Sequence, residues 1–481
     1  MLSLKLRKMV MKMKKKLFST LILVTLLASV LPSLPVMASP AVLQFDLIAD
    51  GGSAATAVDV GDVLVWNDEE YLYVEYVTDG WYISEVHLEV KTALGNIPQK
   101  NGNPIPGKFT YGEKGLWTMD YEFDPIPLSW PADTQLYIAA HAKVWEAASL
   151  TSMSVVSAPG VSVYGPSSSY HPVGDFVWGT SNPAVATWVH TSWPSIPGAT
   201  WISTAYDNEF PRPDSWRWFR DTFNVPGYPK SGNIVAATSD NAEEVYLNGV
   251  LVGSDGEVQG PFIDNQEWQT ILNYPIAPQM GSNTLDFIVR NYAYGTDDPH
   301  VNPTGLIYKA SVEYYAREET AWGAGTGFSG KNWATYFTYT VQGWVLLETL
   351  TVDSTSVTGT TSTTVLDSSK TYKFEASGTW TNTVNNVADA EYTSKDNWAT
   401  HADGYIWPPY AYLGANFGDL QVGSTFINWG SYSASHVYDY EHAGTGTTVT
   451  FRVFDGEDPN PVPSWYGDNS GSLTVDIFIW Q

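Results

Sequence analysis

The residues with the clearest chemical potential lie in an acidic loop near the carboxyl end of the chain. Two stretches with strand-like alternation, 447–453 and 472–479, flank this loop. It carries Asp455, Glu457, Asp458, Asp468 and Asn469. Carboxylates crowded into one loop repel each other unless solvent or a cation separates them, and hard oxygen ligands suit calcium. The sequence therefore predicts a calcium site, with a tight turn capped by its own Asp and Asn side chains as the alternative.

The run GDNSGSLTVDI at 467–477 resembles the end of the small bacterial calcium-dependent galactose-binding lectins, in which calcium bridges a loop and two vicinal sugar hydroxyls. The resemblance implies that Asp455, Asp468, Asn469 and the carbonyl of Trp465 hold the metal. It also implies sugar contacts at His401, Asp403, Asp455 and Asp468, because the segment HADG at 401–404 is similar to the sugar-contacting histidine region.

The chain departs from the lectin pattern in three places. The loop 455–465 is several residues longer, Asp468 stands where the lectins carry Asn, and Gly404 stands where they carry the Gln that reads the sugar. The resemblance therefore supports the fold and metal binding more than galactose specificity. Nearby, Asp389 and Glu391 add acids that either complete the ligand set or lie solvated on a loop, and solvation is the expectation.

The middle of the chain carries the motifs of a jelly roll. The run AATSDNAEEVYLNGVLVG at 236–253 and GSNTLDF at 281–287 resemble galactose-binding-like modules. Asn-Gly at 248–249 predicts a hairpin turn, since that turn requires positive φ at both positions. Four rings, Trp188, His190, Trp193 and Trp201, are candidates for an aromatic binding face, with partial burial in the core as the alternative.

Glu85, His87 and Glu89 alternate on one predicted strand of the first block and so share one face, with His141 on a later strand. A metal site is one interpretation. A buried or cross-strand histidine pair is the favoured one. The strand patterns at 59–63 and 71–76 are similar to those of an uncharacterised domain of secreted prokaryotic proteins.

The elements that must position these residues are almost entirely strands, because apolar residues alternate with period two between Gly, Asn, Asp and Pro. The fold prediction is all-β: three antiparallel β-sandwich or jelly-roll domains after a signal peptide. The expected segments are 1–38 for the signal peptide, 39–150, 170–316 and 346–481. The segment 317–345 either completes the first sandwich, with the second inserted into it, or is a linker strand.

The first 38 residues have the pattern of a secretory signal: a basic run, an apolar run at 17–31, and small residues before 39. An uncleaved anchor helix is the alternative. With cleavage, the chain is expected outside the cell or on its surface, without membrane insertion. The formal net charge is −27, and removal of 1–38 takes away seven basic residues and no acidic one, which gives −34. Such a surface repels nucleic acid.

The sequence contains no cysteine and no zinc-protease, nucleophile-elbow, phosphate-loop or dinucleotide motif. These absences favour a non-catalytic protein, and the lectin resemblance implies that it binds a carbohydrate or glycoconjugate through calcium. Two alternatives stay open. One is a structural extracellular or surface-layer protein in which calcium only staples the fold, and the other is a polysaccharide-degrading enzyme with its two acids among these loops.

Overall fold

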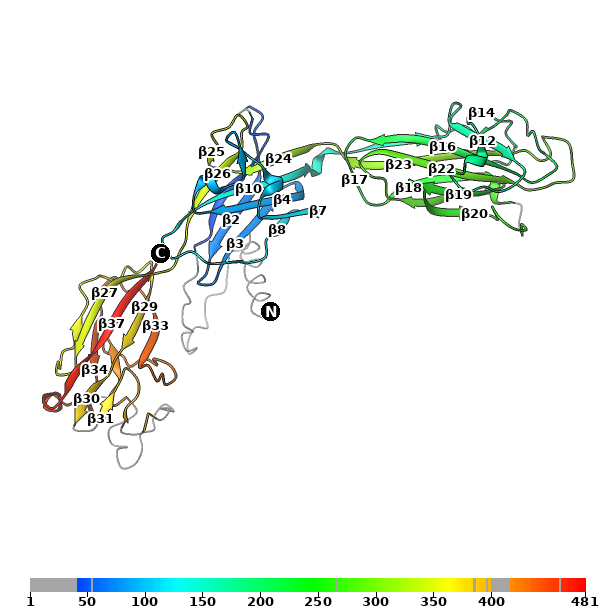
Figure 1. The fold of residues 1–481 in the computed structure, drawn as a ribbon. Helices are drawn as coiled ribbons and strands as arrows, with labels where there is room; N and C mark the ends of the chain where they lie inside the picture. The colour runs from blue at the N-terminus through cyan, green and yellow to red at the C-terminus, as the bar shows by residue number, and fades with distance from the viewer. Residues whose placement is uncertain are drawn as a thin grey trace, which may run out of the picture. The chain divides into compact units, whose positions relative to one another are not determined.

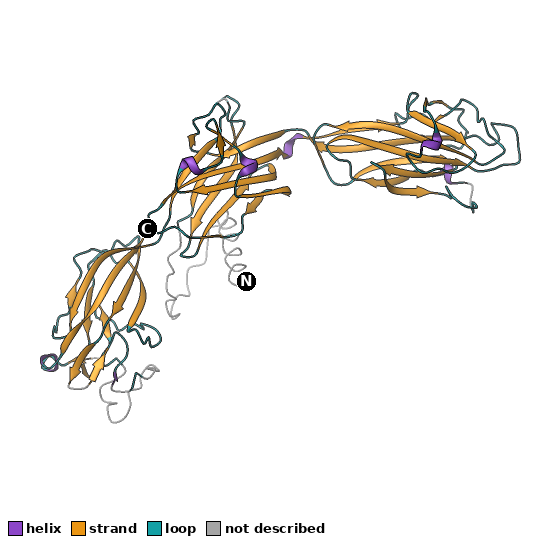
Figure 2. Cartoon of the chain, viewed as in Figure 1, coloured by secondary structure: helices purple, strands orange, loops and turns teal. Residues whose placement is uncertain are grey.

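The computed structural model describes residues 41–52, 55–263, 266–383, 386–394, 397–398, 416–457 and 460–481, so the predicted signal peptide at 1–38 lies outside the described residues. Antiparallel sheets account for almost all regular structure among them, which confirms the all-β prediction (Figure 2). The chain divides into two compact units, one of which is Pro40–Gln342 while the other contains Gly343–Gln481. The short 3₁₀ turns are η2 (Leu94–Asn96), η3 (Pro106–Lys108), η4 (Ala147–Ser149), η5 (Phe176–Trp178), η6 (Glu267–Gln269) and η9 (Trp465–Gly467).

The first sandwich is one curled sheet of eleven strands. Period-two alternation explains it: in Tyr71–Thr78 every second side chain is buried, so one face of the strand turns inward. Its strands are β1 (Leu43–Ala49), β2 (Val58–Asn67), β3 (Tyr71–Thr78), β4 (Trp81–Lys91), β7 (Tyr111–Thr118), β8 (Asp120–Glu122), β9 (Ile126–Pro127), β10 (Gln135–Glu146), β24 (Glu318–Gly323), β25 (Thr326–Gly327) and β26 (Thr335–Thr340), with β5 (Gln99–Lys100) and β6 (Asn103–Pro104) forming a separate hairpin.

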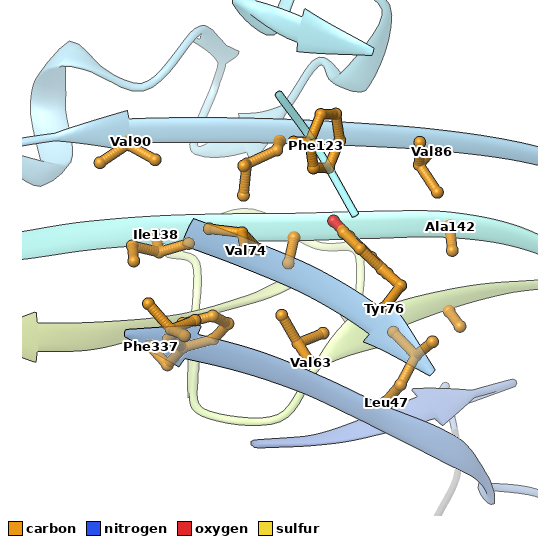
Figure 3. Close-up of a cluster of buried hydrophobic side chains, with 14 of the residues drawn as sticks. Leu47, Val63, Val74, Tyr76, Val86, Val90, Phe123, Ile138, Ala142 and Phe337 are labelled. Atoms are coloured by element: carbon orange, nitrogen blue, oxygen red, sulfur yellow. The ribbon is translucent and has the colours of Figure 1, made fainter. Parts of the chain in front are cut away.

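The curl of this sheet encloses a core of aliphatic and aromatic side chains. Figure 3 shows the buried Tyr76 side chain between Phe123 and Leu47. The Tyr76 hydroxyl donates a hydrogen bond of 3.0 Å to the carbonyl of His87, so this polar atom is satisfied inside the apolar core. Burial raises the pKa of Tyr76 well above its ordinary value, which keeps the hydroxyl protonated and able to donate.

Strands from two distant parts of the sequence complete the first sheet. β10 pairs with β4 along one edge and with β24 and β26 along the other. Since β11 to β23 lie between β10 and β24 in sequence, the whole middle sandwich is inserted between two strands of the first (Figure 1). The chain crosses into the middle sandwich from β10 to β11 and returns from β23 to β24.

The middle sandwich packs a seven-stranded sheet against a six-stranded one around an apolar core. The hairpin predicted at 248–249 is confirmed, because Leu247 pairs with Val250 and both turn residues have positive φ. The first sheet contains β11 (Leu150–Val156), β14 (Val185–Ala186), β15 (Ile202–Ser203), β17 (Tyr228–Pro229), β18 (Asn233–Asp240), β21 (Leu272–Ile276) and β23 (Gly305–Tyr315); the second contains β12 (Ser162–Ser167), β13 (Asn182–Pro183), β16 (Ser215–Val225), β19 (Ala242–Leu247), β20 (Val250–Asp255) and β22 (Gly281–Asn291).

The C-terminal sandwich is built around its last strand, which pairs with three others. A six-stranded sheet faces a three-stranded one, and their apolar side chains form one core. The six strands are β27 (Trp344–Asp353), β29 (Thr371–Ser377), β30 (Trp380–Thr383), β31 (Asn386–Ala388), β33 (Val437–Ala443) and β37 (Ser470–Trp480); the three are β28 (Thr360–Thr361), β32 (Leu420–Val422) and β34 (Thr450–Val453), with β35 (Gly456–Glu457) and β36 (Asn460–Pro461) as a small hairpin.

Gly61 of β2 lies so close to the backbone of β3 that a side chain does not fit there. Its φ is +144°, and an added Cβ would lie 2.0 Å from the Val77 carbonyl oxygen. We expect Gly61→Ala to destabilise the Pro40–Gln342 unit by at least about 1–3 kcal/mol, the usual cost of such backbone strain. The matched control is Gly95→Ala, where nothing lies within 4 Å and φ is ordinary. Urea unfolding followed by tryptophan fluorescence measures both, and equal midpoints for the two variants would contradict this packing.

Candidate functional site

The acidic loop leaves the C-terminal sandwich after β34 and returns to it at β37. Buried Tyr466 ties the two ends of the loop together. Its hydroxyl donates to the Val453 carbonyl at 3.0 Å and accepts from the Asp455 backbone amide at 3.3 Å. Asp455 itself is only 2% exposed. The predicted metal ligand at the end of β34 is therefore inside the end of the sandwich, close to the segment that leads into β37.

Asn469 is the second buried member of the predicted set, with 7% of its surface exposed. Its Nδ2 donates a 2.8 Å hydrogen bond to the carbonyl of Ser354, which fixes the orientation of the planar amide. Its Oδ1 is buried and has no hydrogen-bond partner in the described part of the chain. A buried acceptor left without a donor costs about 1–3 kcal/mol. This oxygen therefore lies where a donor or a cation would be stabilising.

The remaining predicted site residues are either less buried than Asp455 and Asn469 or lie outside the described residues. Asp468 is exposed and follows η9, so its side chain is at the surface of the loop. Trp465 is half-buried, and its carbonyl accepts a 3.3 Å hydrogen bond from the Asp468 amide, which leaves one lone pair of the oxygen for another contact. His401 and Asp403, predicted to contact sugar, and Asp458 of the acidic loop lie outside the described residues.

A further buried acid adjoins this loop and was missed by sequence reasoning. Asp419 is 3% exposed, and its carbonyl accepts a 2.7 Å hydrogen bond from the amide of Phe454, next to Asp455. Nothing in the local sequence distinguishes this acid, because the β32–β34 pairing that brings it to the loop is non-local. No group of three His, Cys, Asp or Glu side chains within the described ranges is arranged to hold a metal. The predicted calcium ligands include only two such side chains, Asp455 and Asp468, together with the Asn469 amide and the Trp465 carbonyl. The absence of a group of three His, Cys, Asp or Glu side chains in the described part of the chain therefore does not test a set of this kind.

Asp389 was expected on a solvated loop, and this expectation is wrong: it is fully buried. One carboxylate oxygen accepts from the backbone amides of Glu391 and Tyr392, at 2.9 and 2.7 Å. The other accepts from the Tyr438 hydroxyl at 2.8 Å and lies 2.7 Å from His436 Nδ1. These hydrogen bonds compensate the burial of the carboxylate and fix the imidazole, with Nδ1 carrying the proton and Nε2 as the acceptor.

Aromatic rings surround this Asp389–His436 pair. The Trp398 ring lies 4.8 Å from the His436 ring, and Tyr432 lies 5.9 Å from it. Trp398 and His436 both have positive φ, a conformation that bulky residues rarely adopt and that concentrates at functional sites. The pair occupies the same end of the sandwich as Asn469, since the Gly378 amide donates to the His436 carbonyl and β30 pairs with Gly471.

The four aromatic candidates of the middle sandwich separate into two kinds. Trp193 and Trp201 stack on each other at 4.1 Å and are buried, so they belong to a small core outside the seven-stranded sheet. Trp188 and His190 are half-exposed. Beneath the buried pair, Trp193 Nε1 donates to the Asp240 carboxylate at 2.9 Å. Burial raises the pKa of Asp240 to about 8, so this carboxyl is largely protonated at neutral pH.

In the first sandwich, His87 and His141 face each other directly across the β4–β10 ladder, with ring centroids 5.7 Å apart, which confirms the cross-strand pair. His87 Nε2 lies 2.5 Å from a Glu85 carboxylate oxygen, which also binds Lys114 Nζ at 3.0 Å. Burial, followed by the charge of His87, lowers the pKa of His141 to about 3. The pair is therefore a structural feature in which His141 stays neutral.

No helix in the described part of the chain is long and apolar enough to cross a membrane. No protein-family model and no curated protein matches the sequence. Solved structures with partial likeness include α-L-rhamnosidases. That from Streptomyces avermitilis has 12% identity and a TM-score of 0.18, with 92% of this chain and 36% of that chain covered. That from Dictyoglumus thermophilum has 11% identity and a TM-score of 0.16, with 86% of this chain and 46% of that chain covered. That from Aspergillus terreus has 11% identity and a TM-score of 0.18, with 91% of this chain and 49% of that chain covered.

This chain spans between a third and a half of the length of those enzymes. At TM-scores this low the likeness supports neither a shared topology nor a shared activity. The functional argument therefore depends on the geometry of the chain itself.

The buried carboxyl of Asp240 gives a pH prediction. Its folded-state pKa of about 8 is above the unfolded value of about 3.9. Between these values the folded state keeps a proton that the unfolded state releases, so the free energy of unfolding falls as pH rises, by up to about 1.4 kcal/mol per pH unit. We expect the melting temperature of the middle sandwich to fall from pH 5 to pH 8, and Asp240→Asn to flatten this dependence.

The control for that experiment is Asp297→Asn, which neutralises an acid whose side chain is 81% exposed. Calorimetry at several pH values separates the variants. Glu243, whose pKa burial raises to about 7, contributes in the same direction and stays in both variants. A pH profile of Asp240→Asn that equals that of the unmodified protein would show that the Asp240 carboxyl is ionised in the folded state.

Proposed function

We propose that this chain is a secreted or cell-surface, non-catalytic carbohydrate-binding protein whose C-terminal sandwich holds calcium, with sugar hydroxyls completing the coordination of the ion. One observation carries the proposal: the buried Oδ1 of Asn469 has no hydrogen-bond partner in the described ranges, while the opposite edge of its amide is fixed on Ser354. Calcium takes roughly six to eight oxygen ligands, with carboxylate and amide oxygens among the commonest. An orphaned amide oxygen at the end of the sandwich that also holds buried acids matches that preference.

The buried acids at this end of the sandwich support a cation rather than a neutral donor. Asp455 and Asp419 are both buried, and the β32–β34 ladder brings them to the same end of the sandwich. Burial of carboxylates in neighbouring loops costs free energy, and a divalent cation between them would offset that cost. Exposed Asp468 would approach such an ion from the solvent side of the loop.

The sugar side of the proposal uses the Asp389–His436 pair. Its buried carboxylate leaves His436 Nε2 as a hydrogen-bond acceptor, and Tyr432 is partly exposed next to it. A sugar presents hydroxyl donors at its rim and an apolar C–H face to a ring, so an acceptor beside aromatic rings is suited to it. The acidic charge of the chain disfavours nucleic acid and acidic polysaccharides as partners.

Calcium should stabilise the C-terminal sandwich measurably. Extracellular calcium modules bind with a Kd of about 10⁻⁴ to 10⁻³ M, so 10 mM calcium should add about 1.4–2.7 kcal/mol. We expect a rise in the melting temperature of the full chain in calcium relative to chelator, and loss of most of that rise in Asp455→Asn. The shape-matched control is Asp439→Asn, an exposed acid on β33. Equal calcium shifts in both variants would contradict the assignment of Asp455.

Glycan binding should depend on the calcium and on His436 separately. A glycan array with the full chain is expected to include glycans whose signal is present in calcium and lost in chelator. His436→Asn suits the backbone, because Asn tolerates positive φ and its amide can still donate to Asp389, but it lacks an acceptor at Nε2. Loss of one hydrogen bond predicts about tenfold weaker binding with the calcium-induced thermal shift retained. Unchanged glycan affinity in His436→Asn would exclude this imidazole from the sugar contact.

A further inference from the structure

A chain of four aromatic and imidazole rings lies on the middle sandwich. His300 stacks on Trp188 with centroids 4.7 Å apart, Trp188 lies 6.1 Å from His190, and His190 lies 5.3 Å from Trp268. We call these four residues the aromatic strip. They come from three separate connections of the chain, after β14, in η6 and between β22 and β23, so only the fold brings them together.

Hydrogen bonds hold the strip in a fixed shape. The Trp188 amide donates to the Tyr206 carbonyl at 2.7 Å. The Ser192 amide donates to His190 Nδ1 at 3.2 Å, which makes Nδ1 the acceptor and leaves the proton on Nε2. The His300 amide donates to Asp298 at 2.9 Å, while its ring lies 2.8 Å from Asp207. A surface that is ordered before its ligand arrives loses less entropy on binding.

The strip is accessible to solvent, unlike the Trp193–Trp201 pair beneath it. Trp188, His190 and Trp268 are half-exposed, and the side chains of His300 and Asp207 are 48% and 50% exposed. A contiguous exposed apolar surface edged with polar groups marks a binding site. The apolar ring faces here alternate with polar atoms, namely the His190 imidazole and the His300–Asp207 pair.

We propose that the aromatic strip is a second, calcium-independent binding site for neutral oligosaccharide chains. His300 covers one face of Trp188, and the other neighbouring rings meet edge to face. The outer ring faces and the ring edges therefore pack on the apolar C–H faces of pyranose units, and the His190 N–H and the Asp207 carboxylate take up sugar hydroxyls. Consecutive rings a few ångströms apart suit an extended chain rather than a single sugar. The exposed acids Asp207 and Asp298 repel carboxylated or sulfated chains, which restricts the ligand to uncharged glycans.

The same charges argue against a membrane as the occupant. Segments that bind a bilayer surface combine apolar side chains with Lys and Arg. The strip is instead bordered by Asp207 and Asp298, both exposed, in a chain of net charge −27. This inference does not depend on the calcium site of the C-terminal sandwich, because the two surfaces belong to different compact units of the chain.

Affinity electrophoresis of the full chain in gels that contain one polysaccharide each tests the proposal. The probes are mixed-linkage β-glucan, xyloglucan, galactomannan and arabinan as neutral chains and polygalacturonate as the anionic one, all in the presence of chelator. We expect retardation by at least one neutral chain and none by polygalacturonate. Trp188→Ala should weaken the retardation at least tenfold, and His300→Ala should weaken it too.

Phe176→Ala is the matched control, since Phe176 is 92% exposed on η5, outside the strip, and should leave retardation unchanged. Asp455→Asn should also bind as the unmodified protein does in chelator, which separates this site from the calcium site. Calorimetric melts confirm that each variant is folded. The proposal is overturned if no neutral chain retards the protein, if folded Trp188→Ala and His300→Ala both bind normally, or if the protein binds lipid vesicles through Trp188 instead.

Discussion

The register of the last strand is the constraint on which the C-terminal sandwich and its site depend. β37 pairs with β27 and β29 along most of its length and with β30 at its start. These ladders place Ser354, Gly378 and Gly471 at one end of the sandwich, so Asn469 meets the Ser354 carbonyl there. A slip of β37 by one residue would invert its faces and bury Thr474 and Asp476 in place of Leu473 and Val475. The site is therefore a consequence of strand pairing rather than of the loop alone.

The two proposed surfaces follow one physical logic on separate parts of the chain. On the C-terminal sandwich, loops at one end carry polar atoms whose orientation a buried partner fixes: Asp389 beneath His436, and Ser354 beside Asn469. On the middle sandwich, the buried Trp193–Trp201 pair supports the exposed rings. The strands form a rigid scaffold, and the connections between them carry the side chains that would bind a ligand, as is usual for binding sites on loops.

Local sequence signals were sufficient for the class of fold but not for the site. Alternation of buried and exposed side chains in β3 and the Asn-Gly turn at 248–249 are local, so both predictions are confirmed. Residues such as Asp389 and Asp419 look like ordinary loop acids, because their burial arises from strands far away in sequence. The position of Asp389, two residues before Glu391, does indicate a turn in which the Asp side chain caps its own backbone. It does not indicate the hydrogen bond between Asp389 and His436. Periodicity likewise could not separate exposed Trp188 from buried Trp193.

The central claim is that the end of β34 and the start of β37 enclose a cation. A crystal structure of the full chain grown with calcium, with data collected for anomalous scattering, tests it most directly. The account predicts an anomalous peak about 2.3–2.6 Å from Asn469 Oδ1, with an Asp455 carboxylate oxygen in the same shell. A hydrogen-bond donor or a water in that position, with no anomalous peak in saturating calcium, would contradict it.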